Sequence, residues 1–253
     1  MRVAVIGLGV VGRAQARMLA GHTLVTYDAA GGDPYPETQI AGCDFAVITV
    51  GTPAAADGSA DLAQVYEAFR RLPAGLPVLI RSTVPPRTTA ALQARHGAPV
   101  CHAPEFMHER PGGAWRETTD VPYLILGGTP AACAFFRPLL AAVFPGRIHE
   151  CSATEAELVK YTANLHWAAR VTFVNEMARI CAAVGAHWEN VRAAWLEDPR
   201  VAPEYTGYAG FPPGFGGRCW PKDLAALIAA ARDRGYHPAF LESVQEANRR
   251  FQG

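Results

Sequence analysis

The chain has 253 residues, of which 50% are hydrophobic and 18% charged, and its formal net charge at pH 7 is zero. This composition is typical of one or two packed globular domains and excludes an intrinsically disordered chain. Because there is no basic surplus, binding to nucleic acid through a charged face is not expected. No apolar stretch approaches the roughly 20 residues that cross a bilayer, so no membrane partner is expected either.

The cysteines are scattered along the chain, at positions 43, 101, 133, 151, 181 and 219. Since no C-x-x-C pair or knuckle-like histidine spacing occurs, the sequence predicts neither a disulfide framework nor a metal site. The opening segment MRVAVIGLGVVG has glycines at fixed intervals instead of the cleavage pattern of a signal peptide. The expected location is therefore the reducing cytoplasm.

The first part of the chain alternates short apolar segments with helical ones. Strands are predicted at 2–6, 23–28, 43–53, 77–86, 99–107 and 122–128. Helices are predicted at 15–20, 61–72 and 130–144. This alternation is typical of βαβ units, in which a parallel sheet is covered by helices on both faces. The sequence therefore predicts an α/β fold, a Rossmann-type doubly wound sheet over residues 1–150.

The pattern changes near residue 150. Residues 154–184 form one run without proline or glycine that is apolar on most sides, as in a helix buried in a core or a subunit interface. A shorter helix, a loop rich in Gly, Pro and aromatic residues, and a helix from Pro221 follow. We predict an all-helical domain over 151–253, and a homodimer through the helix at 154–184, whose apolar surface would otherwise be exposed.

The stretch GLGVVG lies directly between the first predicted strand and a helix. Gly7 permits a tight turn, Gly9 lets a pyrophosphate approach the backbone, and Gly12 packs the helix on the strand. Val10 and Val11 complete this turn, where the helix N-terminus stabilises phosphate charge. The spacing and its context predict a dinucleotide-binding site.

Polar side chains at later strand ends extend this predicted site. Asp28 ends the second strand about 20 residues on, where a carboxylate binds the ribose 2′-OH, so NAD is favoured over NADP. Thr52 and Thr83 each lie toward the carboxyl end of a later predicted strand and are candidate cofactor contacts. The alternative is that their hydroxyls cap loop backbone. Glu105 and Glu109 lie at the end of a further predicted strand. They are either acids of the site or solvated loop residues.

Lys160 and Asn164 are four residues apart on the long predicted helix and therefore share a face. A cation and an amide on an otherwise apolar helix fit the binding of an oxyanion. The alternative is a surface ion pair between Glu157 and Lys160.

The stretch GFGGRCWPKDL places Cys219 just before a predicted helix, because Pro221 suits a first helical turn. The helix N-terminus and the nearby Lys222 both favour the thiolate, the reactive form of cysteine. The preceding glycines let backbone approach a ligand closely. A cysteine taken alone is more often a small buried hydrophobe, so both interpretations stay open on local grounds.

Together these segments resemble the UDP-glucose/GDP-mannose 6-dehydrogenase family. The matching pieces are, in family order, GLGVVG, DFAVITVGTP…DGSADL, STVPP.T, APEF..E, ELVKYTANLHWAARVTFVNEMA, DPRV and PGFGGRCWPKDL. The resemblance implies an NAD-dependent, four-electron oxidation of a primary alcohol to a carboxylate.

It also implies residue roles. Cys219 would attack an aldehyde-level intermediate to give a thiohemiacetal, which is oxidised to a thioester. Lys160 and Asn164 would stabilise the oxyanion. Lys222 would support the Cys219 and nicotinamide end of the site, and Asp223 with Glu105 would handle water and protons in hydrolysis. Thr83 and Glu109 would line the nicotinamide pocket. Gly216 and Gly217 would belong to the substrate loop, and Arg200 would reach the substrate across a dimer interface.

The chain also departs from the family pattern. VPPRT replaces the usual Val-Pro-Val-Gly-Thr, Ala202 stands where glycine is usual, and the segment after Asp28 is short. The chain stops at ESVQEANRRFQG, about where the family's second α/β domain should begin. The expected substrate is therefore a nucleotide, sugar phosphate or other small phosphorylated or phosphonate alcohol from a specialised pathway, not an ordinary UDP-sugar.

Two alternatives to this function remain. One is a two-electron alcohol or hydroxyacid dehydrogenase on the same fold, in which Cys219 is not essential and Lys160 polarises the carbonyl. The other is a non-catalytic NAD-binding subunit.

Overall fold

A computed structural model describes the chain except for residues 108–120, 208–212 and 253. The described chain forms two compact units: unit 1 comprises residues 1–53 and 60–160, and unit 2 comprises residues 54–59 and 161–253. The sequence placed a boundary near residue 150. In the structure the division falls inside a long helix, at Lys160.

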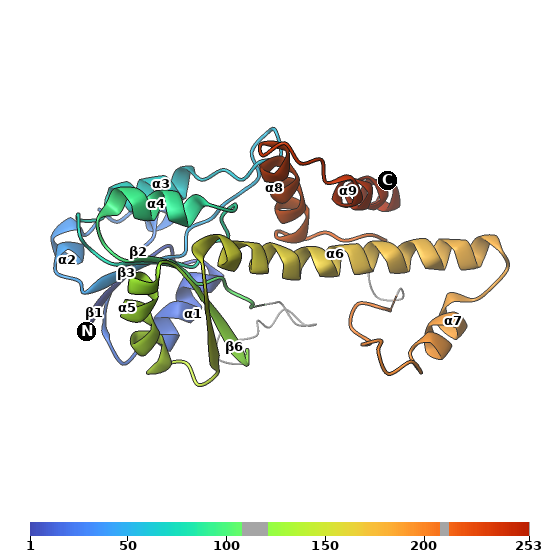
Figure 1. Cartoon of the computed structure of the whole chain (residues 1–253), viewed down its shortest axis with the longest axis horizontal. Helices are drawn as coiled ribbons and strands as arrows, with labels where there is room; N and C mark the ends of the chain where they lie inside the picture. Colours follow the sequence, from blue (N-terminus) through green and yellow to red (C-terminus); the bar gives the residue numbers. More distant parts are fainter. Residues whose placement is uncertain (108–120, 208–212, 253) are drawn as a thin grey trace. The chain divides into compact units, whose positions relative to one another are not determined.

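Within its described residues, unit 1 contains a seven-stranded sheet in the order β2-β1-β3-β4-β5-β6-β7 (Figure 1). The strands are β1 (Arg2–Ile6), β2 (Thr23–Tyr27), β3 (Phe45–Ile48), β4 (Val78–Ile80), β5 (Val100–His102), β6 (Tyr123–Gly127) and β7 (Arg147–Cys151). The strand order reverses at β1, between β2 and β3, as in a doubly wound fold, and ligands bind such sheets at the carboxyl ends of the strands beside that point.

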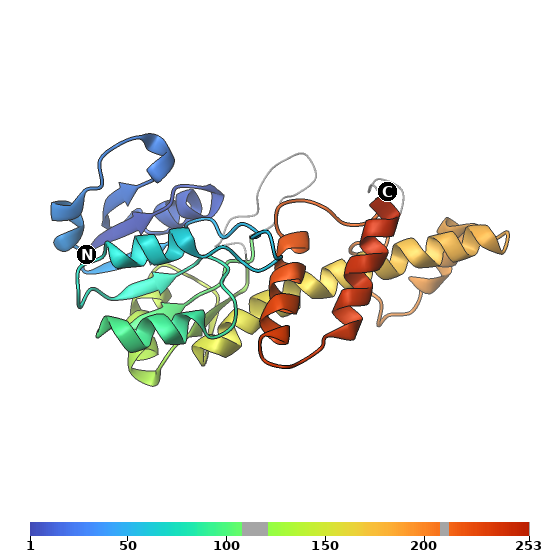
Figure 2. The same ribbon diagram turned by 90° about the horizontal axis from the view of Figure 1, so that it is seen from above.

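Helices lie on both faces of this sheet, α3 and α4 on one and α1 and α5 on the other (Figures 1 and 2). The helical segments of unit 1 are α1 (Val10–Met18), a 3-10 turn (Ala29–Gly31), α2 (Glu37–Ala41), α3 (Ala63–Arg70), α4 (Thr88–His96) and α5 (Pro130–Ala141).

The central strands are buried on both faces, which explains their nearly continuous apolar sequences. In β3, Ala46 and Ile48 belong to the core beneath α3, whereas Phe45 and Val47 belong to the core beneath α5. Successive side chains of a strand point to opposite faces, so one apolar run supplies two cores.

The prediction of a parallel sheet is wrong for one pair of strands, because β6 runs antiparallel to β5. The sequence shows no helical pattern between these strands, and antiparallel neighbours, unlike parallel ones, need no helical crossover. The sequence also did not predict α2, α4 and β7. The burial pattern of β7 is mostly exposed, so it lacks the apolar run that marks the central strands.

Unit 2 is helical in its described residues. Helix α6 (Ala153–Ala183) starts in unit 1 and continues through unit 2, followed by α7 (Trp188–Trp195), α8 (Trp220–Arg232) and α9 (Ala239–Gln252). The last of these was not predicted from the sequence. In the described part of the chain, no helix combines the length and the apolar character that crossing a membrane requires.

Candidate functional site

The Gly-rich turn between β1 and α1 is shaped by steric limits at two of its glycines. Gly7 has a φ of +94°, and a Cβ on it would lie 2.8 Å from the carbonyl carbon of Thr49. A Cβ on Gly12 would lie 1.8 Å from the carbonyl oxygen of Gly7. A Cβ on Gly9 would have no atom within 4 Å, so this glycine faces open space. The structure thus leaves room for a ligand at Gly9.

The first turn of α1 supplies donors to that open side. Gly9 is the N-cap and provides no side-chain cap, and the first turn contains no acidic residue. Val10 and Val11 lie in this turn, where main-chain N–H groups have no partner within the helix. Such a helix start attracts anions such as a pyrophosphate.

Asp28 lies beside the turn despite its distance in sequence. Its Oδ2 accepts a hydrogen bond from Leu8 N at 2.6 Å, and its Oδ1 accepts one from Ala30 N at 2.9 Å. The carboxylate therefore holds the Gly-rich turn as well as ending β2. The hydroxyl of Thr49, which the sequence did not single out, contacts the Gly7 carbonyl at 2.6 Å.

Thr52 and Thr83 meet each other in the loops after β3 and β4. The Thr52 hydroxyl donates to the Thr83 carbonyl at 2.8 Å, and Ser82 donates to the Val50 carbonyl at 2.7 Å. These crossed bonds tie the two loops together. Thr52 thus makes the loop-backbone contact considered as an alternative, and a cofactor contact of either threonine stays a prediction.

Glu105 is buried, and its carboxylate accepts hydrogen bonds from both side chains and main-chain groups of the described residues. The side chains of Gln15 and Arg81 donate to its Oε2, and the main-chain N–H groups of Phe106 and Met107 donate to its Oε1. Glu105 is therefore not a solvated loop residue. Glu109, the second predicted acid, lies outside the described residues.

His102, the last residue of β5, was not singled out from the sequence. It is fully buried, and burial, followed by the positive charge of Arg81, lowers the pKa of its imidazole to about 3. The ring is neutral near pH 7, so His102 is not a candidate acid.

Lys160 does not form the surface ion pair that was the alternative interpretation. Glu157 is fully buried and accepts from the main-chain N–H groups of Arg87 at 2.6 Å and Thr89 at 2.7 Å, at the start of α4. Lys160 is half-buried, and its Nζ lies 5.2 Å from the centre of the Phe106 ring. Glu157 thus caps the start of α4 and is not the partner of Lys160.

Cys219 is the N-cap residue of α8, with Pro221 in the first turn as predicted. All six cysteines lie in the described part of the chain, and Cys219 alone among them is exposed. Burial raises the pKa of the thiols of Cys43, Cys101 and Cys133, and raises that of Cys151 to about 11. Exposure at a helix N-terminus separates Cys219 from these thiols.

Three of the predicted site residues meet in the first turn of α8, the helix that Cys219 caps. Asp223, in the first turn of α8, is buried and accepts from Asn164 Nδ2 at 2.6 Å and from Lys222 Nζ at 2.5 Å. The cluster joins α6 to the start of α8. The Asn164 amide nitrogen therefore already has an acceptor, and its role at an oxyanion stays a prediction.

The loop before Cys219 is held by amide side chains that sequence reasoning missed. Asn175 on α6 accepts from Gly214 N at 3.0 Å. Asn248 on α9 accepts from Phe215 N at 2.6 Å and donates to its carbonyl at 2.9 Å, and Gln252 also donates to that carbonyl. Asn175 and Asn248 are buried, and the available signal was the amide of Asn175 within the largely apolar run of α6.

Gly216 and Gly217 complete this loop, and Gly217 has a φ of +79°. A Cβ on Gly217 would meet no atom within 4 Å, so the positive φ, and not lack of space, is what favours glycine there.

Arg200 is exposed, and its guanidinium binds Asp198 of the same chain, with 2.6 Å between Nη2 and Oδ2. A contact of Arg200 with substrate across a dimer interface stays a prediction.

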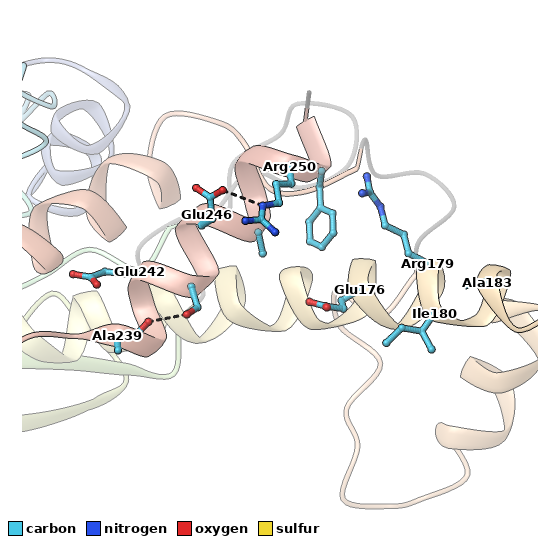
Figure 3. Close-up of a pocket in the computed structure, with 11 residues that line it drawn as sticks. Glu176, Arg179, Ile180, Ala183, Ala239, Glu242, Glu246 and Arg250 are labelled. Carbon is cyan, nitrogen blue, oxygen red and sulfur yellow. Dashed lines mark hydrogen bonds and ion pairs between the residues drawn. The ribbon is translucent and has the colours of Figure 1, made fainter.

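A separate groove of about 780 Å³ runs between α6 and α9 in unit 2 (Figure 3). It is lined by Glu176, Arg179, Ile180, Ala183, Ala239, Glu242, Ser243, Glu246, Ala247, Arg250 and Phe251. None of the predicted site residues borders it, and its charged residues form ion pairs such as Glu246–Arg250. This groove is therefore distinct from the candidate site.

Two family profiles match the chain. Residues 35–144 match the NAD binding domain of the UDP-glucose/GDP-mannose dehydrogenase family, and residues 154–250 match its central domain. The chain belongs to this family. The described residues also fit NAD, since the open Gly9, the uncapped start of α1 and the Asp28 carboxylate suit a pyrophosphate and a ribose.

Individual relatives agree with this assignment. A UDP-glucose 6-dehydrogenase of Pseudomonas aeruginosa is 35% identical over 230 residues, covering 83% of this chain and 49% of its own length. A Bacillus subtilis enzyme of the same name is 32% identical, covering 83% and 47%. A solved UDP-glucose dehydrogenase from Pyrobaculum islandicum is 29% identical with a TM-score of 0.85, covering 98% and 68%. The chain spans about half the length of these curated relatives.

Proposed function

We propose that the protein is an NAD-dependent dehydrogenase that oxidises a primary alcohol to a carboxylate through covalent attachment to Cys219. The observation that carries this proposal is the position of Cys219, an exposed thiol at the N-cap of α8, beside a first turn in which the buried Asp223 bonds to Asn164 and Lys222. A thiolate at a helix N-terminus is stabilised by the helix dipole and is a competent nucleophile.

In this mechanism the Cys219 thiolate adds to the carbonyl carbon of the aldehyde-level intermediate. A C–S bond forms, and the carbonyl oxygen takes the negative charge, which we assign Lys160 and Asn164 to stabilise. NAD, when bound, would supply the hydride acceptor for both oxidations, which take place at the alcohol carbon and then at the carbon attached to Cys219. Water then adds to the thioester, the C–S bond breaks, and the Cys219 thiolate leaves. Covalent attachment retains the reactive aldehyde between the two oxidations.

The substrate class we propose is a nucleotide, a sugar phosphate or another small phosphorylated or phosphonate alcohol. Relatives named for UDP-glucose support a phosphate-bearing substrate. Departure from an ordinary UDP-sugar rests on the sequence differences at Pro86, Arg87 and Ala202. The Ala202 carbonyl accepts a hydrogen bond from Arg170, so the changed segment is tied to α6.

We further propose a homodimer through α6. The large apolar side chains of Phe173 and Ile180 on α6, and of Val184 just after it, are 52%, 46% and 74% exposed in the single chain, and such surface favours association. Analytical ultracentrifugation tests this proposal. A stable monomer at micromolar concentration would contradict it, and with it the reach of Arg200 across an interface.

The catalytic proposal is tested by incubating the protein with NAD and a panel of primary alcohols that includes UDP-glucose. Two NADH per alcohol and a carboxylate product are expected, and Cys219→Ser should lose at least about 1,000-fold in turnover. Cys43→Ser is the matched control and should keep wild-type turnover. One NADH per substrate with an aldehyde or ketone product, unaffected by Cys219→Ser, would select the two-electron alternative. NAD binding without turnover on the panel would favour the non-catalytic subunit.

A further inference from the structure

Arg218 directly precedes Cys219, and both residues are exposed. The charged side chains of residues 213–223 are those of Arg218, Lys222 and Asp223. Lys222 and Asp223 bind each other, with 2.5 Å between Nζ and Oδ1, so their charges are mutually compensated. Arg218 has no ion pair or hydrogen bond from its side chain to any residue that the structure describes. The segment therefore keeps one uncompensated positive charge, next to the candidate nucleophile.

Most arginines of unit 2 have an anionic partner among the described residues. The ion pairs are Arg192–Glu189, Arg200–Asp198, Arg232–Glu242, Arg249–Glu246 and Arg250–Glu246. Arg234 is exposed and unpaired like Arg218 in the described part of the chain, but it follows the C-terminal end of α8. The helix dipole favours a cation at that end, so Arg234 needs no further partner.

Arg218 lies at the opposite end of the same helix, where the dipole is unfavourable to a cation. A helix N-terminus carries about half a positive charge and stabilises anions. An acidic residue in the first turn could offset Arg218, but the acid in that turn, Asp223, is already bonded to Lys222 and Asn164. A bound anion would compensate both the guanidinium and the helix end.

We infer that Arg218 is a specificity-determining residue, whose guanidinium binds a phosphoryl or phosphonyl group of the substrate while Cys219 reacts. A guanidinium binds such a group through two parallel N–H···O bonds, which fix its orientation as well as adding affinity. Because consecutive Cα atoms are only about 3.8 Å apart, the bound group must lie close to the carbon that Cys219 attacks.

Among the substrate classes proposed above, this position selects a small alcohol whose phosphoryl or phosphonyl group lies a few bonds from the hydroxyl. The catalytic consequence rests on the proposed function, in which Cys219 is the nucleophile. Anion binding by Arg218 does not, and it can be measured without any turnover.

Two alkylating reagents of similar size test the charge beside Cys219. Iodoacetate is anionic and iodoacetamide is neutral, and both react with the same thiolate, so the ratio of their rates reports the local charge. At an ionic strength of about 0.1 M, charges more than about 10 Å away are screened. Arg218→Gln should then lower the ratio of iodoacetate to iodoacetamide rates by about threefold or more. An equal ratio in wild type and Arg218→Gln would overturn the inference.

Arg234→Gln is the matched control, because it removes the same charge from the far end of α8. The helix has 13 residues, which places that end about 20 Å from Cys219. The rate ratio of Arg234→Gln should therefore equal that of the wild type. An equal fall in both variants would show a general effect of net charge and would also overturn the inference.

Inorganic phosphate and methylphosphonate test whether the charge binds an anion. Each should slow the alkylation of Cys219 by iodoacetamide in a saturable way, in wild type and in Arg234→Gln, without NAD and at constant ionic strength. Arg218→Gln should bind both anions at least about tenfold more weakly. Equal protection of wild type and Arg218→Gln, or protection of neither, would overturn the inference.

Steady-state kinetics on the phosphate-bearing alcohols of the panel test the catalytic consequence. Arg218→Gln should raise KM at least about tenfold and keep kcat within about twofold, because binding of a non-reacting group is lost equally from the ground and transition states. Arg218→Lys keeps the charge without the bidentate geometry and should recover part of the affinity.

The NADH Kd distinguishes the substrate from the cofactor, which also carries phosphates. It should be the same in wild type and Arg218→Gln, and weaker NADH binding in the variant would assign Arg218 to the cofactor and overturn the inference. Anion binding by Arg218 in a protein without turnover would count against the proposed function alone. Turnover through Cys219 with an unchanged KM in Arg218→Gln would count against the role of Arg218 alone.

Discussion

The Gly-rich turn of unit 1 and the loop before Cys219 in unit 2 are both glycine-containing segments in front of a helix. The first owes its glycines to close backbone packing, with Gly12 against the Gly7 carbonyl, although the side chains of Asp28 and Thr49 also bond to it. The second is held by amide side chains 33 to 39 residues away along the chain. A motif made by its own backbone can be recognised from its spacing. A loop held by distant side chains needs the structure.

The largest expected effect is at Gly12. A Cβ on Gly12 would overlap a backbone oxygen, so Gly12→Ala should lose about 3 kcal/mol of unfolding free energy and bind NADH at least about 100-fold more weakly. Thermal unfolding and NADH fluorescence titration measure these changes.

Gly9→Ala is the matched variant, because its Cβ would meet no protein atom. It should keep wild-type stability and still lose NADH affinity, since only a bound pyrophosphate would contact the new methyl group. Wild-type NADH affinity in Gly9→Ala would show that the cofactor does not approach this glycine.

On the other side of the comparison, Asn248→Ala removes both bonds from Asn248 to the backbone of Phe215. Since a buried N–H without an acceptor costs about 1–3 kcal/mol, we expect a loss of about 2 kcal/mol and faster alkylation of Cys219 in the loosened loop. Urea unfolding and iodoacetamide kinetics measure the two effects. Asn190→Ala, at an exposed position, is the control. An unchanged alkylation rate would show that the loop does not depend on its amide anchors.

Glu157 tests whether anchoring by distant side chains is confined to unit 2, because it caps α4 in unit 1 from α6. Glu157→Gln should lose about 1 kcal/mol at acid pH, where one of the two N–H groups loses an acceptor. Burial raises the pKa of Glu157 in the folded state. Its stabilising contribution is therefore complete below the unfolded pKa and declines as pH rises through the folded one.

The deficit of Glu157→Gln relative to wild type should accordingly narrow as pH rises. Urea unfolding of both proteins at several pH values measures it. A deficit that widens toward alkaline pH would mean that the hydrogen bonds outweigh burial at this carboxylate.

The smallest effect is expected at Arg87, which has a φ of +79° at the N-cap of α4. A left-handed residue with a side chain costs about 1–2 kcal/mol, partly offset by the entropy that glycine loses on folding. Arg87→Gly should therefore stabilise the protein by about 0.5–1 kcal/mol. Gly97→Ala, at φ +72° at the other end of α4, should destabilise it by about 1 kcal/mol. Thermal unfolding with the same sign for both variants would contradict this account.

The same contrast explains how much could be predicted from the sequence. Apolar runs and the glycine spacing predicted the Rossmann-type sheet and its NAD-binding turn, because each follows from local rules of burial and backbone conformation. The spacing of Pro221 likewise predicted the helix that begins at Cys219. Their sequence signals are local, although the finished structure adds distant partners such as Asp28 and Thr49.

What could not be predicted depends on long-range contacts. The direction of β6 depends on its pairing with β5. Glu157 entered the sequence analysis only in the alternative of a surface ion pair, because its partner at the start of α4 is 68 residues away. The bonds of Gln15 and Arg81 to Glu105 could not be predicted either, because both partners are distant in sequence. The roles of the individual site residues remain predictions.

Because Cys219 is the one exposed cysteine of the six, a thiol reagent can be used to count the chains that carry a free Cys219. A thiol reagent added to the native protein should modify one residue per chain, so the labelled fraction measures how many chains carry an intact nucleophile. Such a titration would let turnover be expressed per competent site in any preparation, including one in which some chains are oxidised.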